Sequence, residues 1–164
     1  MDDEQFLDDC RQRCRMVKHI SEDVEWLEKP NHSGWLIARA SLQDEHGITI
    51  PRLYFQAVYM PGSKGEKISY ALMYRNGTMS CRTFMLEVYP KHVLSHREPG
   101  KNIFGPHIQL GHEKLGFVAR AVISNLSEPL STRWVERFRR HARIFDTDKH
   151  KLTAPFPDDL FGKT

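Results

Sequence analysis

The spacing of apolar residues changes twice along this chain. In the first 20 residues, apolar positions recur every three or four residues, which is the period of an amphipathic helix. Between residues 35 and 89, apolar and polar positions alternate, as they do in strands with one buried face. The helical period returns over residues 129–145. The pattern predicts an α+β fold with an N-terminal helix, an antiparallel sheet and a C-terminal helix packed on one sheet face.

The first helix is expected over residues 3–20, with Asp2 or Asp3 as its N-cap. Cys10 and Cys14 lie one turn apart, as two metal ligands can, but no Cys or His partner stands at ligand spacing. We therefore expect both cysteines on the buried face of the helix. That face is expected to hold Phe6, Cys10, Cys14 and Val17.

Four successive strands are expected between residues 35 and 89, joined by short turns into an antiparallel meander. Asn76-Gly77 is the strongest hairpin signal, because both central residues of a type I′ turn need positive φ. A strand around Ile108 and an apolar segment at 117–124, which favours strand over helix, bring the total to five or six strands. The polar segment "PKHVLSHREPGKN" before them is expected to be a long loop.

The closing helix is expected to begin near Ser131 or Thr132, one of which caps it. The Pro-rich segment after residue 152 is expected to lie extended or to fray. Both helices should pack their apolar stripes on the same face of the sheet, because each element has one apolar side. The expected core residues are Leu36, Phe55, Leu72, Phe84, Leu86, Trp134 and Phe138, with Val135 and Ala142 on the helix stripe.

Length and composition indicate a single domain of 164 residues. We divide it into an acidic helical arm (1–28), the sheet (34–124), the closing helix (129–145) and a Pro-rich tail (152–164). No apolar run reaches the roughly 18 residues of a membrane span, and no signal segment is evident, so no membrane contact is expected. The three cysteines form no regular framework, which favours a reducing cytoplasm.

The net charge of +3 is unevenly distributed. Residues 1–30 hold five Lys or Arg against nine Asp or Glu, which gives −4, and the remaining residues hold nineteen against twelve, which gives +7. A basic body is compatible with an anionic partner, although many small domains carry a similar imbalance without one.

Four of the nine histidines fall within residues 92–112. His107 and Gln109 share one face of the expected strand, and His92 and His96 stand in the preceding loop, which can fold over that face. The alternative is that His107 donates to a backbone carbonyl and the other histidines are ordinary loop residues.

Arg82 and Glu87 precede this loop on a neighbouring strand. Their numbers differ by five, so a regular strand points the two side chains to opposite faces. Both can join one site with the histidines only if a bulge lies between them or the strand ends there.

Two chemistries are open to these residues. Metal-free phosphodiester cleavage needs one neutral and one protonated histidine, here His107 and His92, and a cation such as Arg82 or Lys101, with Glu87 nearby. It needs no cofactor. A metal site would take its ligands from His92, His96, His107 or His112 with Glu87, but "HVLSHREPG" lacks the flanking Glu of the metalloprotease signature, and no metal is assigned.

Binding without chemistry is the third possibility. The arginines of the closing helix can track phosphates or form a solvated face. Tyrosines on the strands can stack on bases or pack the sheet. The candidate ligand contacts are His96, Lys101, Gln109, Arg133, Arg137 and Arg140, and the strand tyrosines are Tyr54, Tyr70 and Tyr74.

The run "RTFMLEVYPKH…GKNIFGPHIQLG…ARAVIS…RWVERFRRHARI" resembles a family of small, uncharacterised bacterial and phage-borne proteins over about half the chain, from 75 to 144. The family pattern has an Arg strand, a loop His, Gly-x-His-Ile-His on the next strand, an apolar segment and a closing helix. Gln109 stands where the pattern has its last histidine, which argues against paired-histidine chemistry on this strand. The matching positions are Arg82, His92, Gly105, His107 and Ile108.

These observations favour a small accessory protein that binds a partner protein or an anionic nucleic acid or phosphate ligand. It would be a phage or mobile-element factor of the inhibitor or toxin–antitoxin type. A histidine phosphodiesterase is the alternative and a histidine metal site the third hypothesis, so the sequence leaves open whether the protein is an enzyme.

Overall fold

The computed structural model describes residues 2–126 and 128–155, and it has the expected α+β class with a mostly antiparallel sheet. The helices are α1 (Asp3–Arg15) and α2 (Thr132–Ala142). The strands are β1 (Lys18–Ile20), β2 (Leu27–Glu28), β3 (Leu36–Gln43), β4 (Thr49–Met60), β5 (Lys67–Asn76), β6 (Met79–Val88), β7 (Leu94–Glu98), β8 (Lys101–Phe104), β9 (His107–His112), β10 (Gly116–Ala121) and β11 (Ile144–Phe145).

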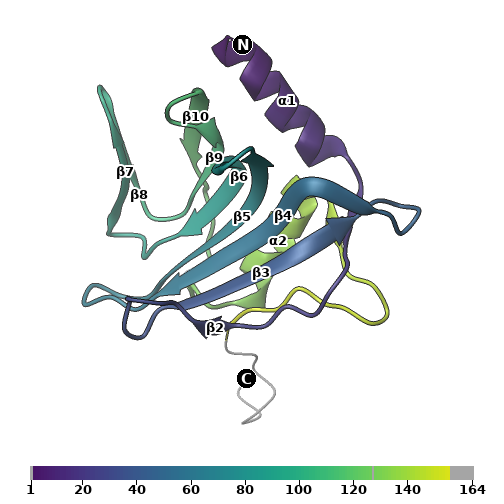
Figure 1. Ribbon diagram of the computed structural model, residues 1–164. Coiled ribbons are helices and arrows are strands. Elements are labelled where there is room, and N and C mark those ends of the chain that lie inside the picture. Colours follow the sequence, from purple (N-terminus) through teal and green to yellow (C-terminus); the bar gives the residue numbers. More distant parts are fainter. Residues whose placement is uncertain (1, 127, 156–164) are drawn as a thin grey trace.

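The expected number of five or six strands is wrong. The main sheet of the described chain has nine strands, in the order β10-β9-β6-β5-β4-β3-β1-β11 with β2 paired to β3, and β7 and β8 form a separate two-stranded sheet (Figure 1). Strands β3 to β6 are the expected meander. Strands β1, β2 and β11 have only two or three residues each, too few for an alternating pattern to show.

Helix α1 ends at Arg15, so the prediction of a helix to residue 20 is wrong. Asp2 caps its start, as expected, by accepting a hydrogen bond from the Gln5 amide at 2.7 Å. At its other end the chain turns at Met16, where ψ is 133°. The fully buried Lys18 then directs its Nζ to three main-chain carbonyls at the helix end. These are the carbonyls that a helix terminus leaves without partners, so Lys18 stabilises the termination.

Helix α2 supplies the centre of the hydrophobic core. Its cap is Ser131, and its buried stripe is the predicted one. Phe138 is fully buried, with its ring centroid 5.7 Å from Phe55, 5.9 Å from Tyr70 and 6.0 Å from Phe84. Among the expected core residues, Leu36 is only half-buried, because it stands near the end of β3.

Helix α1 packs across β6, β9 and β10 and touches α2, so both helices lie on one side of the sheet, as expected (Figure 1). The approach of α1 to the sheet depends on Gly116, where φ is +142°. A Cβ atom at this position would lie 2.7 Å from the carbonyl oxygen of Asp3. A side chain here would therefore displace the first turn of the helix.

The hairpin between β5 and β6 is confirmed, but its turn differs from the prediction. Asn76 pairs with Met79, so the two turn residues are Gly77 and Thr78. Of these two, Gly77 alone has a positive φ, of 62°. A single positive φ at the first turn residue is what a type II′ turn requires, whereas type I′ needs two.

Two other segments depart from expectation. The polar segment after β6 is not a long loop, because β7 and β8 pair within it as a hairpin. The segment at 117–124, by contrast, contains strand β10, as the sequence favoured.

The Pro-rich tail is the second departure. Leu152 and Ala154 are buried in the core and do not fray, and residues 156–164 lie outside the described residues. Neither helix in the described ranges is long and apolar enough to cross a membrane.

Candidate functional site

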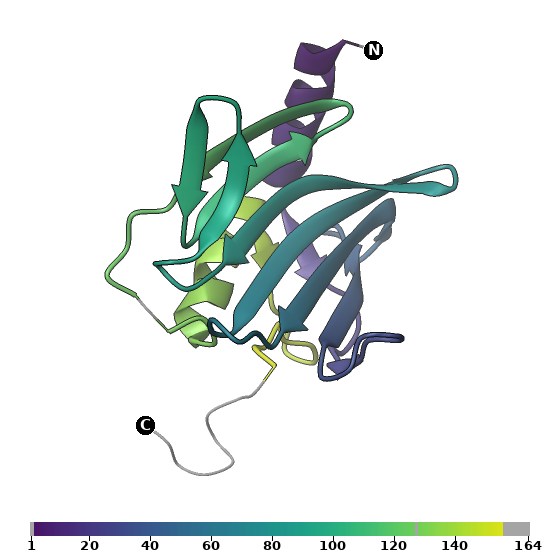
Figure 2. The same cartoon turned by 90° about the vertical axis from the view of Figure 1, so that its left-hand side faces the viewer.

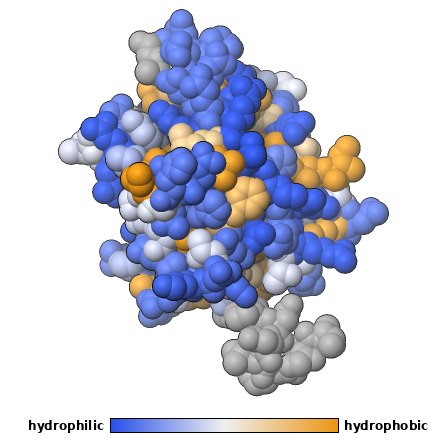
Figure 3. All heavy atoms as spheres, turned by 90° about the vertical axis from the view of Figure 1, so that its right-hand side faces the viewer, coloured by the Kyte–Doolittle hydropathy of each residue, from blue (hydrophilic) through white to orange (hydrophobic). Residues whose placement is uncertain are grey.

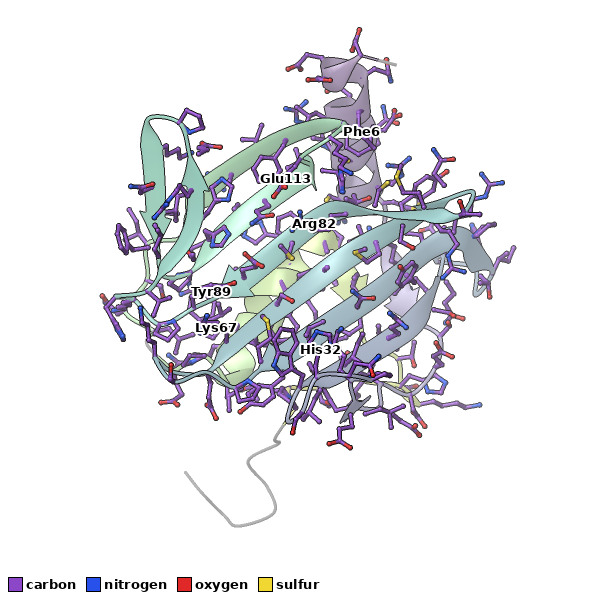
Figure 4. All side chains as sticks on the ribbon, turned by 60° about the vertical axis from the view of Figure 1, so that its left-hand side comes forward. Phe6, His32, Lys67, Arg82, Tyr89 and Glu113 are labelled. Atoms are coloured by element: carbon purple, nitrogen blue, oxygen red, sulfur yellow. The ribbon has the colours of Figure 1, made fainter. Side chains whose placement is uncertain are left out.

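The face of the sheet opposite α2, which we call the open face, carries rows of side chains that are mostly polar. Ala71, Met73 and Met85 form a small apolar cluster within these rows, with Tyr54 packed against it. Figure 4 looks onto this face with α2 behind the sheet. The rows follow from strand register, because directly paired residues point to the same side. The first row is Ile37, Val58, Ser69, Glu87 and His107; the second is Arg39, Gln56, Ala71, Met85 and Gln109; the third is Ser41, Tyr54, Met73 and Arg82.

A β-bulge places Arg82 on the open face together with Glu87. Leu72 pairs with Phe84, whereas Met73 pairs with Arg82, so β6 contains one extra residue, Thr83, at this point. An extra residue reverses the alternation, and Arg82 and Glu87 therefore point to the same side although they are five positions apart. The bulge that a shared site required between Arg82 and Glu87 is therefore present. Arg82 lies beside Glu113 in Figure 4, with charged groups 3.7 Å apart.

The β7–β8 hairpin lies over the β9–β10 end of the open face (Figure 2). His96 of β7 has its ring centroid 5.8 Å from that of His107 and 5.2 Å from that of Phe117. Lys101 of β8 donates a hydrogen bond to the carbonyl of Ala119 on β10. The predicted return of this segment onto the strand is thus observed, and the hairpin buries the part of the face below it.

His107 is fully buried in a polar cluster under the hairpin. Its Nε2 lies 2.9 Å from Oε2 of Glu87 and 2.7 Å from Nε2 of Gln109, which also donates to Glu87 at 3.2 Å. One ring nitrogen carries either a proton or a lone pair, so it serves the carboxylate or the amide but not both. Oε1 of Gln109 has no partner within the described chain. The cluster therefore has more hydrogen-bonding groups than it satisfies.

The predicted partner of His107 does not join this cluster. His92 is exposed and makes no hydrogen bond, ion pair or ring contact in the part of the chain that the structure describes. His96, which was predicted as a ligand contact and as a possible metal ligand, lies beside His107 instead and is 3.3 Å from Glu98. No three His, Cys, Asp or Glu side chains among residues 2–126 and 128–155 are grouped so as to hold a metal ion.

The arginines of α2 lie away from the histidines, on the other side of the sheet. Arg137 stacks on the ring of Trp134 at 4.9 Å and, with Arg140, lines a hollow that also contains His141. Burial, together with the positive charges of Arg120, Arg140 and Arg137, lowers the pKa of His141. Arg133 is exposed. These side chains form a cationic group that is separate from the open face.

A second cationic group, which the sequence did not single out, lies at the uncovered end of the open face. Arg39 of β3, Arg52 of β4 and Arg75 of β5 line one hollow together with Tyr54. Arg39 donates to Oε1 of Gln56 at 2.8 Å, and Arg75 lies 5.5 Å from the ring centroid of Tyr54. None of the three has a carboxylate within 4.0 Å among the described residues. One signal was available: Pro51 interrupts an alternating strand, which is typical of a bulge.

No protein-family model, curated protein or solved structure matches this chain. The resemblance to a bacterial and phage-borne family stays a prediction. The interpretation of the site depends on the geometry of its own residues.

Proposed function

We propose that this protein binds a single-stranded nucleic acid on the open face of its sheet and uses its histidines for structure. The observation that supports this most directly is that four neighbouring strands, β3 to β6, each direct an arginine to the uncovered part of that face. They are Arg39, Arg52, Arg75 and Arg82, of which Arg82 alone has a carboxylate within 4.0 Å among the described residues.

The arrangement of these cations favours an extended polyanion over a small anion. Neighbouring strands are about 4.8 Å apart, so arginines on four of them are spread over roughly 15 Å. A chain with regularly spaced phosphates can contact several of them at once, and each contact releases counterions. Tyr54 lies among them on the same face and offers a ring on which a base can stack.

The histidine cluster is better explained as structural. An acid or base must come within hydrogen-bonding distance of the substrate, and His107 has no exposed surface. The side chain of His96 is 10% exposed and is turned toward Glu98 and the cluster. We therefore propose that the pair holds the β7–β8 hairpin against the sheet. The phage or toxin–antitoxin role suggested by the resemblance stays a prediction.

A protein partner fits the surface less well than a charged ligand. Figure 3, which shows the right-hand side of Figure 1 and so the surface away from the open face, is mostly hydrophilic with scattered apolar residues. The large exposed apolar residues come from separate strands and connecting segments, among them Leu27, Ile48, Phe104 and Ile123. Protein-binding surfaces usually have a continuous apolar centre.

The test is fluorescence anisotropy with labelled single-stranded RNA and DNA and the corresponding duplexes, at about 50 to 200 mM salt. We expect single strands to bind more tightly than duplexes. Arg39→Ala and Arg82→Ala should each weaken binding. Each should also reduce the slope of log affinity against log salt concentration by about one, because one fewer phosphate is contacted. The matched control is Arg97→Ala, an exposed arginine on the hairpin.

The competing cationic group is tested in the same assay. Arg137→Ala and Arg140→Ala should leave the affinity unchanged, because these side chains lie on the opposite side of the sheet. Loss of binding in these variants with full binding in the open-face variants would transfer the site to α2. No measurable binding of any strand would overturn the proposal.

A further inference from the structure

An irregular part of β4 lies at one end of the open face. Register with β3 shifts between Ser41, which pairs with Tyr54, and Gln43, which pairs with Thr49. Residues 50–53 of β4 therefore stand opposite one residue of β3. A hollow of about 300 Å³ lies against this bulge. Its polar lining includes Glu22, Arg39, Ser41, Arg52, Tyr54 and Arg75.

The backbone at Arg52 is in a conformation that a side chain disfavours. Its φ is 67°, in the left-handed region, which residues other than glycine rarely adopt. Pro51 precedes it and has no amide hydrogen to donate to the ladder. Strained residues and bulges are enriched at functional sites and at sheet edges. The bulge places the exposed Arg52 side chain at the hollow.

The charged groups around the hollow leave a positive excess. Three arginines and one carboxylate, Glu22, give +2. Oε1 of Glu22 accepts a hydrogen bond from the Ser41 amide at 2.6 Å, so this carboxylate is held by the backbone. No ion pair joins it to Arg39, Arg52 or Arg75. Three guanidinium groups therefore share one hollow, although like charges repel.

From this geometry we infer that the hollow binds a terminal phosphate of the strand that lies on the open face, an inference that depends on the proposed nucleic-acid binding. A phosphomonoester carries a charge of about −1.5 to −2 and three strong acceptor oxygens, whereas an internal diester carries about −1. Arginine forks match phosphate oxygens in pairs. The charge excess of +2 at the hollow therefore matches a terminal phosphate better than an internal diester.

The experiment compares oligonucleotides of one sequence that differ only at their ends: a 5′-phosphate, a 3′-phosphate, or hydroxyls at both. We expect one phosphorylated form to bind about tenfold more tightly than the hydroxyl form, the gain from one well-placed charge-assisted contact. The phosphorylated form that binds more tightly identifies which end of the strand occupies the hollow. Equal affinity of the three forms would overturn the inference while leaving the proposed function in place, whereas absence of binding by all three would overturn both.

Two variants are expected to change the preference for the phosphorylated form in opposite directions. Arg52→Gly removes the cation and suits the positive φ, so it should fold normally. It should weaken binding of the hydroxyl form only as much as Arg39→Ala does, and it should lose the tenfold preference for the phosphorylated form. Glu22→Gln keeps an acceptor for the Ser41 amide and removes the negative charge, so it should increase the preference. Arg97→Ala is the control that should leave the preference unchanged. A preference that persists in Arg52→Gly would place the phosphate elsewhere.

Discussion

His107 and Glu87 face each other from β9 and β6, with 2.9 Å between Nε2 and Oε2. His107 is fully buried, whereas the Glu87 side chain is 15% exposed. A histidine held in this way is fixed by the strand on one side and by the overlying hairpin on the other. The residue that the sequence marks as a catalytic candidate is thereby suited to join two parts of the fold.

Replacing His107 with Ala should destabilise the protein by about 3 kcal/mol, because it leaves a cavity and removes one partner of a buried polar cluster. The melting temperature should fall and amide exchange in β7 and β8 should rise, while oligonucleotide binding at a temperature where the variant is folded should stay unchanged. His92→Ala is the control and should behave as wild type. A variant with normal melting but no binding would show that His107 contacts the ligand.

Removing the ring of Phe138 should be among the most damaging core changes. Phe138→Ala is expected to cost about 3–5 kcal/mol, because the ring contacts three aromatic rings from β4, β5 and β6. Chemical denaturation of both proteins measures the difference. Phe104→Ala, at a position that is 55% exposed, is the matched control and should change the free energy of unfolding by less than about 0.5 kcal/mol.

The contact between α1 and β10 can be tested at Gly116. Gly116→Ala should destabilise the protein by more than about 1 kcal/mol, because the new Cβ meets the Asp3 carbonyl and the positive φ is strained. Gly47→Ala is the matched control, with φ +79° and nothing within 4 Å of its added Cβ. If thermal melting shows the same loss for both variants, steric contact with the helix contributes nothing.

Stability should depend on pH through Lys18. Burial lowers the pKa of Lys18 from 10.5 to about 8, with the Cys14 and Arg143 charges acting in opposite directions. The unfolded chain therefore binds more protons than the folded one between about pH 8 and 10.5, and stability due to this group rises with pH over that window. As pH rises through this window, the free energy of unfolding of the wild type should increase relative to that of Lys18→Met by at most about 1.4 kcal/mol per pH unit.

The neighbouring thiol works in the opposite direction. Burial raises the pKa of Cys14 from 9.0 to about 11, so its contribution falls as pH rises between these values. Urea titrations of both proteins in a Cys14→Ser background separate the two groups. A difference that is constant across the window would show that Lys18 titrates normally.

The spacing of apolar residues predicted the helices and strands that bury one side and are long enough for the repeat to be visible. The meander, the cap at Asp2 and the stripe on α2 all follow from local patterns. The early end of α1 did not, because Lys18 reads as a helix former and its burial against helix carbonyls depends on packing. The β7–β8 hairpin was missed because its strands, of five and four residues, are too short and too polar for an alternating pattern to show.

The site was predicted less well than the fold. The shared face of His107 and Gln109 followed from strand alternation. The structure brings His96 rather than His92 to His107, and the sequence does not show this because it depends on how the hairpin folds back. The grouping of Arg39, Arg52 and Arg75 could not be seen, because it arises from the register of three strands and a bulge. Each of these arginines alone is an ordinary polar position on a strand.

The parallel pairing of β1 with β11 has a consequence for the order of synthesis. Lys18 pairs with Ile144 in this ladder, although 126 positions separate them along the chain (144 − 18 = 126). A ribosome that adds about 5–20 residues each second leaves the outer side of β1 without its neighbour for roughly 6–25 seconds. During that interval the outer edge of β1 has no partner strand, so the main sheet cannot be completed before β11 has emerged.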